Sequence, residues 1–214
     1  MAMKIKENVF TMQTNKQLTR LILASSSVYR RELLARLQFT FESIAPELGE
    51  SPRSGESPEQ TALRLAQEKA EVIAKNQPEA IIIGSDQVAT LDGLQIGKPG
   101  DHEAALAQLQ LMRGREVTFH TALCVLDNRQ HAAVPVQIQD VCTMVKFRNL
   151  SDAELDAYLR IEQPYDCAGS AKNEGLGIAI IESIKSDDPT ALTGLPLIAL
   201  TSMLRNAGLS FFRL

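Results

Sequence analysis

The stretch LILASSSVYRRELLARL, residues 21–37, places three serines between an apolar run and a segment that opens with two arginines. An apolar run such as LILA is typical of a buried strand, and a serine before an apolar-periodic segment is typical of a helix N-cap. The buried face of the helix is indicated by the spacing of Val28, Leu33, Leu34 and Leu37. We therefore expect a strand that passes directly into a helix.

This junction is also a candidate phosphate site. The first turn of a helix has unpaired backbone N–H groups and a dipole that both favour an anion, and Arg30 or Arg31 can add bidentate contacts to a phosphate. The alternative is an ordinary N-cap followed by solvated arginines, and the stretch alone does not separate the two interpretations. The sequence contains neither GxxxxGK[ST] nor GxGxxG, so the site is neither of the Walker type nor of the Rossmann type.

Strand and helix signals alternate along the rest of the chain. Capping boxes begin predicted helices at Ser57 and Ser151, Asp101 caps another, and Asp92-Gly93 predicts a hairpin turn. The remaining predictions are a buried strand that runs into a polar end within residues 80–91, paired strands at 116–127 and 132–147, a strand at 175–184 and a helix at 195–207. This mixture predicts an α/β fold with a mixed sheet flanked by helices and two lobes around a central cleft.

The composition limits the class of partner and the compartment. The 214 residues include 22 basic and 26 acidic side chains, and the resulting net charge of −4 argues against binding of a long nucleic acid. The three cysteines and three histidines lack zinc-ligand spacing, and a cytoplasmic location fits them best. No apolar run is long enough to span a membrane. We expect residues 1–19 to form a flexible extension and residues 20–214 to form one domain.

Polar residues after the predicted strands could carry chemistry. Asp86 follows the apolar run 80–83, where a carboxylate can act as a general base or hold a divalent cation, although a turn-capping aspartate explains it equally well. Lys98 lies in a predicted loop, where it can meet a phosphate or simply be solvated. Lys172 and Glu174 lie in a glycine-rich segment that lets backbone approach a ligand, and a plain turn is the alternative.

The order of six motifs identifies a family. ASSSVYRRELL, LAQEKA, GSDQV, GKP, YDCAGSAKNEGLG and TGLPL together resemble the Maf family of nucleotide pyrophosphatases over nearly all of residues 20–208. The resemblance implies a Maf/ITPase-like fold and hydrolysis of a nucleoside triphosphate to the monophosphate and pyrophosphate. It also implies a divalent metal requirement, which we expect Mg²⁺ or Mn²⁺ to meet.

The resemblance further implies roles for individual residues. Those expected along the triphosphate are Ser25, Arg30, Lys69 and Lys98, and Lys172 is expected beside the ligand. Asp86 would be the proton acceptor, Glu50 would orient water, and both carboxylates would be metal ligands, with Lys98 completing the catalytic set. The chain departs from the family pattern at Val28, where proline is usual, and at Gly49-Glu50, where an acidic pair is common.

Three positions resemble the branch of the family that acts on 7-methylguanosine triphosphate, namely Tyr29, Gln87 and Glu174. Methylation at N7 makes guanine cationic, so the face of Tyr29 can attract it with about 0.5–2 kcal/mol, whereas an arginine would repel it. Glu174 can accept hydrogen bonds from the guanine edge and offers negative charge. The ordinary alternatives are a partly buried helix aromatic at Tyr29 and a solvated acid at Glu174.

We therefore predict a pyrophosphatase whose substrate is 7-methyl-GTP. A dTTP or UTP pyrophosphatase of the same family and a nucleotide-binding regulator of cell division are the alternatives. Exposed strands in the central predicted hairpin would also suit a homodimer.

Overall fold

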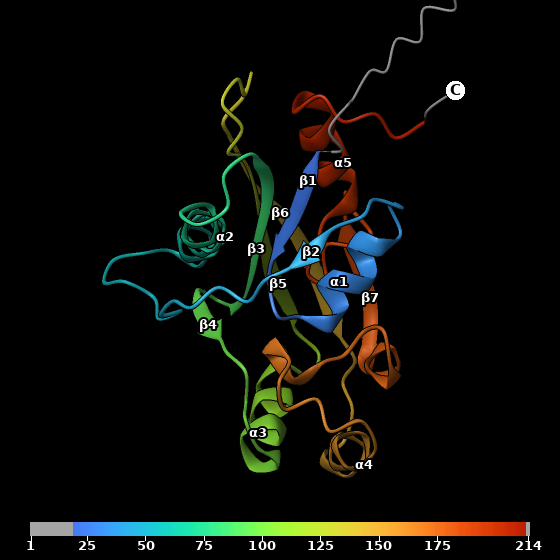
Figure 1. Cartoon of the computed structure of the whole chain (residues 1–214). Helices are drawn as coiled ribbons and strands as arrows, with labels where there is room; N and C mark the ends of the chain where they lie inside the picture. The colour runs from blue at the N-terminus through green and yellow to red at the C-terminus, as the bar shows by residue number, and fades with distance from the viewer. Residues whose placement is uncertain (1–18, 213–214) are drawn as a thin grey trace, which may run out of the picture.

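The computed structural model describes residues 19–212, so residues 1–18 of the expected N-terminal extension lie outside the described part (Figure 1). Its centre is a seven-stranded sheet in the order β2-β1-β3-β5-β6-β7, with β4 also paired to β3. The strands are β1 (Arg20–Ala24), β2 (Glu42–Ser43), β3 (Ala80–Leu91), β4 (Leu94–Ile96), β5 (Glu116–Asp127), β6 (Val136–Phe147) and β7 (Ile181–Ser186). β1 runs parallel to β2 and β3 and every other pairing is antiparallel, so the predicted mixed sheet is confirmed.

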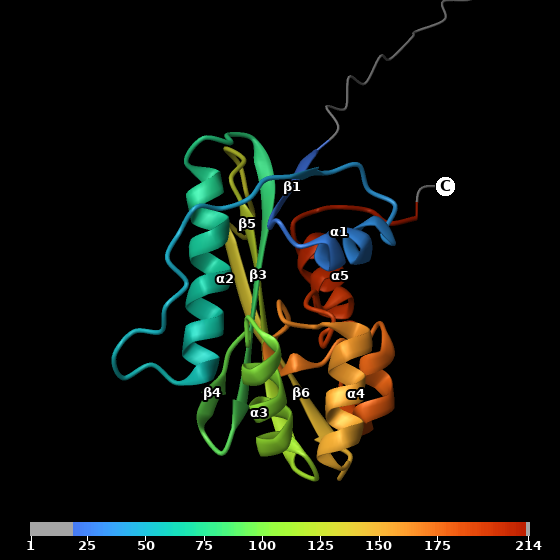
Figure 2. The same ribbon diagram turned by 90° about the horizontal axis from the view of Figure 1, so that it is seen from below.

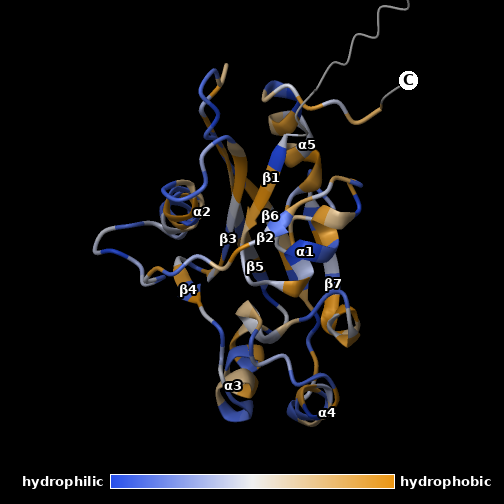
Figure 3. Cartoon of the chain, in the orientation of Figure 1, coloured by the Kyte–Doolittle hydropathy of each residue, from blue (hydrophilic) through white to orange (hydrophobic). Residues whose placement is uncertain are grey.

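Helices cover the two faces and one end of the sheet. They are α1 (Val28–Ala35), α2 (Pro58–Ala74), α3 (His102–Met112), α4 (Asp152–Glu162) and α5 (Leu197–Asn206), with short 3₁₀ segments η1 (Ala168–Ser170) and η2 (Leu176–Ile180). Figure 2 shows α2 on one face, α1 and α5 on the other, and α3 and α4 together at the far end of the long strands. In Figure 3 the apolar strands β1 and β3 run between these helices.

Strand alternation explains this arrangement. Ile81 and Ile83 of β3 pack into an apolar cluster with α1 and α5, whereas Ala80 and Ile82 pack against α2. A third cluster joins the far half of β5 and β6 to α3 and α4. Two clusters on opposite faces at one end and one cluster at the other end give the predicted two lobes.

The local signals in the sequence are confirmed. Ser57 and Ser151 begin α2 and α4 with complete capping boxes, and Asp101 caps α3. Ser27 is the serine of the triplet that caps α1, because its Oγ accepts from the backbone N–H of Arg30 at 3.3 Å. β3 and β4 form the expected hairpin around Asp92 and Gly93. Each of these features depends on a few neighbouring residues only.

The strand predicted within residues 80–91 is confirmed, but Asp86 lies inside it rather than after it, because β5 stays hydrogen-bonded to β3 from Ile81 to Thr90. One predicted strand limit is wrong. The segment 175–184 is a strand only from Ile181 onward, since the backbone N–H groups of Gly175 and Gly177 both bond to the carbonyl of Lys172 and close a turn there.

No helix among residues 19–212 is long and apolar enough to cross a membrane. The predicted hairpin of β5 and β6 is present, and β7 pairs with β6 only from Thr143 to Phe147. Residues 136–142 of β6 therefore have no strand neighbour on their outer side within the described chain, and a homodimer stays a prediction.

Candidate active site

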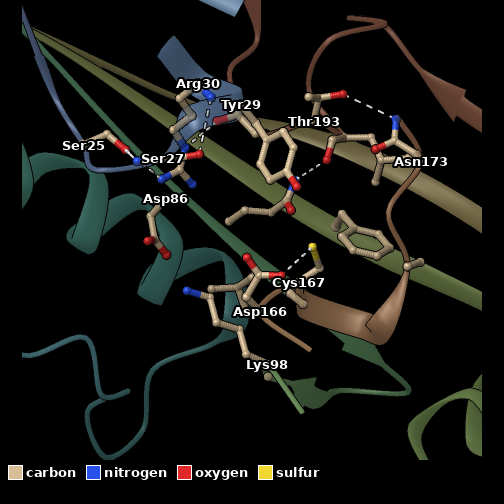
Figure 4. Close-up of a pocket in the computed structure, with 18 of the residues that line it drawn as sticks. Ser25, Ser27, Tyr29, Arg30, Asp86, Lys98, Asp166, Cys167, Asn173 and Thr193 are labelled. Atoms are coloured by element: carbon tan, nitrogen blue, oxygen red, sulfur yellow. Dashed lines mark hydrogen bonds between the residues drawn. The ribbon is translucent and has the colours of Figure 1, made fainter. Parts of the chain in front are cut away.

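A cavity of about 750 Å³ lies between the two lobes. Nine of the ten predicted site residues line it: Ser25, Tyr29, Arg30, Glu50, Lys69, Asp86, Gln87, Lys98 and Glu174. They come from segments far apart in the sequence, and Figure 4 shows several of them pointing into one space. Lys172 is the exception and is not part of the lining.

A gap in the sheet opens this cavity beside β3. On one side of β3 the pairing with β1 ends at Gly84, and the pairing with β4 begins only at Ala89. Residues 85–88 therefore have no strand neighbour on that side within the described chain. Consecutive side chains of a strand point to opposite faces, yet Asp86 and Gln87 both reach the cavity because it wraps around this open edge.

At one end of the cavity a single ammonium group bridges two carboxylates. Lys69 Nζ lies 2.6 Å from Asp86 Oδ1 and 2.7 Å from Glu50 Oε1. The lysine is buried because α2 packs directly on β3 at Gly84, where a Cβ atom would lie 2.1 Å from the carbonyl oxygen of Ala66. Asp86 is also buried, whereas half of the Glu50 side chain is exposed. The three groups form one charged cluster at the cavity wall.

The charge of Glu50 is set by its neighbours. Partial burial opposes ionisation, yet the hydrogen bond from Lys69 and the charges of Lys69, Lys98 and Arg30 keep the pKa of Glu50 below its usual value. The segment that carries Glu50 is tied to α2 by Arg64, whose Nη2 donates to the carbonyl of Ser51 at 3.1 Å. Glu50 is therefore an anion held next to the cationic wall.

The segment 25–30, which contains the three serines, forms another part of the cavity wall. Arg30 Nε donates to the carbonyl of Gly194 at 2.8 Å, which fixes the guanidinium, and its Nη1 lies 3.5 Å from Ser25 Oγ (Figure 4). Burial lowers the pKa of Arg30, while the charges of Asp86 and Glu50 oppose that shift. Since an arginine stays charged in proteins, its free N–H groups can bind a phosphate.

Lys98 completes the cations at this end. It lies in the exposed loop after β4 and lines the cavity, and Figure 4 places it beside Asp166 of the loop that precedes η1. Arg30, Lys69 and Lys98 bring three positive charges to the cavity, where they face the three carboxylates Glu50, Asp86 and Asp166. These three cations are the groups that could bind a polyanion.

Glu50 and Asp86 could bind a metal ion only if the substrate's phosphate groups supplied further ligands. Among residues 19–212 no group of three or more His, Cys, Asp or Glu side chains is arranged to hold a metal. Mg²⁺ is usually bound by one or two carboxylates together with substrate phosphates and water. Glu50 and Asp86, which meet at Lys69 Nζ, fit that donor set.

Tyr29 and Asn173 lie away from the charged cluster (Figure 4), and the cavity lining also includes Phe119 and Glu174. This part, where the family resemblance places the nucleobase, is called the base end. Asn173 Nδ2 donates to Thr193 Oγ1 at 3.3 Å, which joins two rim loops (Figure 4). Glu174 is exposed at the surface, and partial burial raises its pKa while the charge of Lys172 opposes that shift.

Gln87 holds a rim loop in place. Its Nε2 lies 3.1 and 3.0 Å from the carbonyl oxygens of Ala191 and Leu192, and 2.9 Å from Thr121 Oγ1. The neighbouring Ser85 donates to the carbonyl of Gly194 at 2.9 Å. These bonds use the amide nitrogen of Gln87, so its contact with a ligand would be made through the amide oxygen.

Lys172 is held at the back of the base end. Its Nζ lies 3.1 Å from Glu162 Oε1 and 5.8 Å from the centre of the Tyr29 ring. A protein cation therefore already lies near the ring that we expected to receive a cationic base. The sequence analysis missed Glu162, because a glutamate that ends a polar helix gives no functional signal.

Other residues of the cavity lie in motifs that the sequence singled out, but were not themselves predicted to be site residues. Asn173, Thr193 and Gly194 belong to the segments AKNEGLG and TGLPL, and only the structure shows which of their atoms face the cavity. Asp188 was not noted at all. It is buried and accepts from Thr190 and from the backbone N–H groups that begin α5, which fixes the loop between them.

Comparison with known proteins shows to which family the chain belongs. The family model described as "Maf-like protein" matches residues 20–207. The 7-methyl-GTP pyrophosphatase of Cupriavidus pinatubonensis is 63% identical over 199 residues, which cover 93% of this chain and 98% of the relative. The protein of the same name from Cupriavidus metallidurans is 66% identical over 192 residues, which cover 90% of this chain and 95% of the relative.

Among solved structures, a nucleoside-triphosphatase / dITP/XTP pyrophosphatase from Mycobacterium abscessus aligns with a TM-score of 0.45 and 19% identity, covering 88% of this chain and 97% of its own. The family match spans every described element of the sheet and the whole cavity lining. On that match and on the identity to the two Cupriavidus proteins, the chain belongs to the Maf family.

Proposed function

We propose that this protein hydrolyses 7-methyl-GTP to the monophosphate and pyrophosphate. The observation that carries the proposal is the cluster of Lys69, Asp86 and Glu50, which lies with Arg30 and Lys98 at one end of a single cavity. The two Cupriavidus relatives named 7-methyl-GTP pyrophosphatase support the choice of substrate.

The cations position the triphosphate. Arg30 is anchored through Nε to Gly194, so its remaining N–H groups can grip phosphate oxygens without reorganisation. Lys98 on the opposite loop neutralises charge on the departing pyrophosphate. Phosphoryl transfer depends mainly on such positioning and electrostatic stabilisation, because the protein has little covalent chemistry to perform.

Asp86 acts on the attacking water. Lys69 binds Asp86 Oδ1 and thereby orients the carboxylate, while Oδ2 accepts no hydrogen bond from the described part of the chain. Oδ2 can accept the proton of a water molecule that attacks the α-phosphorus. The α–β bridging oxygen then leaves with pyrophosphate.

A divalent cation is part of the proposal. Glu50 and Asp86 would hold Mg²⁺ or Mn²⁺ together with the substrate's phosphate oxygens. When bound, the ion supplies positive charge that polarises those oxygens. Glu50, half exposed and anionic, is the residue placed to receive it from solvent.

The base end favours an electron-poor purine. The Tyr29 ring offers a face to a cationic base, and Glu174 offers acceptors and negative charge to the guanine edge. An unmethylated or pyrimidine base leaves these polar partners poorly matched, which weakens binding.

A panel of nucleoside triphosphates assayed by pyrophosphate release tests the proposal. We expect 7-methyl-GTP to be preferred over GTP, dTTP and UTP, and we expect a chelator to stop turnover until Mg²⁺ or Mn²⁺ is restored. Asp86→Asn should lower kcat by about 10²–10⁴-fold, because it removes the proton acceptor, and a melting curve should show that the variant still folds.

Asp187→Asn, at an exposed aspartate outside the cavity, is the matched control and should keep full activity. A preference for pyrimidines would contradict the substrate, and near-normal turnover by the Asp86 variant would contradict the mechanism. Tight nucleotide binding without hydrolysis would favour the regulatory alternative. A cytoplasmic location belongs to the same proposal and is supported by the three free cysteines.

A further inference from the structure

Glu162, the last residue of α4, is a partly buried carboxylate behind the base end of the cavity. Its side chain is 12% exposed. Oε2 accepts from the backbone N–H of Leu176 at 2.7 Å, and Oε1 lies 3.1 Å from Lys172 Nζ. Each oxygen therefore has its own partner on the segment that carries Glu174.

The backbone of that segment packs directly on the carboxylate. A Cβ atom at Gly175 would lie 2.8 Å from both oxygens of Glu162, so the carboxylate lies directly against the backbone of this glycine. The turn is closed on the carbonyl of Lys172, which accepts from Gly175 and Gly177 at 3.0 Å. Asn173 and Glu174 leave this turn toward the cavity.

The charge of Glu162 has a second consequence. Lys172 lies between Glu162 and the Tyr29 ring, and the hydrogen bond that Lys172 donates to Glu162 raises the pKa of Lys172, so its ammonium stays charged. An uncompensated ammonium at that place would repel a cationic base from the same ring. Glu162 is the carboxylate that compensates it.

We propose that Glu162 is a positioning residue that makes the base end selective for a cationic base. The inference rests on the function proposed above. With Lys172 neutralised by Glu162, the negative charge of Glu174 is left for the base, and Glu32 of α1 adds to it from nearby. Without Glu162, Lys172 would cancel Glu174.

Glu162→Gln separates charge from structure. A glutamine oxygen can still accept from the N–H of Leu176, so the turn stays attached while one negative charge is lost. We expect the ratio of kcat/KM for 7-methyl-GTP to that for GTP to fall by about tenfold. This is the size of effect expected when one negative charge, partly buried and about 10 Å from a cationic base, is removed. Most of the change should be in KM for 7-methyl-GTP, because the phosphate end is untouched.

Two further variants make the test specific. The double variant Glu162→Gln with Lys172→Met should recover the preference, because the uncompensated cation is gone. Glu103→Gln, at an exposed glutamate on α3, changes the net charge equally and should leave the ratio unchanged.

Retention of the wild-type ratio in Glu162→Gln would overturn the inference, and so would equal losses with both nucleotides or a failure of the double variant to recover the preference. If the wild-type protein does not hydrolyse 7-methyl-GTP at all, the proposed function itself is wrong. The assay of the wild-type protein with the panel of nucleoside triphosphates shows this before any variant is compared. Melting curves for each variant show whether the turn stays folded.

Discussion

Replacement of Lys69 by methionine is the sharpest perturbation of the charged cluster. The ammonium group is buried and holds Asp86 Oδ1 and Glu50 Oε1 at 2.6 and 2.7 Å. Methionine has a similar length and packs in the apolar surroundings of α2, so the change removes a charge with little change in volume. Two carboxylates then face one another without a cation between them.

The size of the effect follows from the distances. Because both oxygens contact one nitrogen, they lie at most 2.6 plus 2.7 Å apart, that is 5.3 Å. Two negative charges at that separation repel by about 3 kcal/mol at an effective dielectric constant of about 20, a repulsion that the ammonium of Lys69 offsets in the wild-type protein and that is no longer offset in the variant. Since half of Glu50 is exposed, water screens this repulsion to about 1 kcal/mol, which corresponds to a pKa shift of somewhat less than one unit.

The assay is the pH profile of kcat for Lys69→Met. The group that must be ionised for activity should titrate at higher pH than in the wild-type protein, by about one unit. The plateau rate should be lower by about 10²-fold, since an oriented donor is lost. Lys75→Met, at an exposed lysine at the end of the same helix, should change neither. An unshifted profile with a near-normal plateau would refute the assignment of Lys69 as the bridge between the carboxylates.

Two other changes test the scaffold. Gly84→Ala puts a methyl group 2.1 Å from the carbonyl oxygen of Ala66, so α2 must move off β3; we expect a loss of about 1–3 kcal/mol or more in urea unfolding and weaker activity, and an unchanged unfolding midpoint would contradict the close packing. The pKa of Glu56 is lowered from 4.5 to about 2 by its hydrogen bonds from Arg64 and the backbone of Arg53. Because the pKa of Glu56 is lower in the folded than in the unfolded protein, its ionised form stabilises the fold. This stabilisation is complete above pH 4.5 and is lost as the pH falls to about 2. Glu56→Gln should therefore be less stable than wild type at pH 7 and match it near pH 2, and an equal difference at both pH values would contradict the ion pair.

The sequence predicts the features that depend on neighbouring residues. The caps at Ser57, Asp101 and Ser151 and the turn at Asp92-Gly93 are short-range devices, because each is completed within three residues. The mixed sheet follows from the order of these elements. Boundaries that depend on a distant partner are less predictable, as at Asp86, where only the pairing with β5 shows that the strand continues.

The candidate site divides in the same way. Its charged residues are recognisable from motif order, and nine of the ten meet in one cavity. What the sequence does not reveal is how they are held. Arg30 is anchored by a carbonyl 164 residues away, and Lys172 faces a glutamate whose role no motif indicates. Such contacts are set by the packing of loops from separate elements, which local spacing does not encode.

The open edge of β3 links the two ends of the cavity. Asp86 points to the α2 face and contacts Lys69, whereas Ser85 and Gln87 point to the other face and hold the loop 191–194. The carbonyl of Gly194 in that loop also accepts from Arg30. Any displacement of this short stretch of β3 would move the proton acceptor, the phosphate-binding arginine and the rim of the base end together. A substitution at Ser85 or Gln87 is thus expected to change turnover as well as base preference, although neither side chain needs to touch the reacting phosphate.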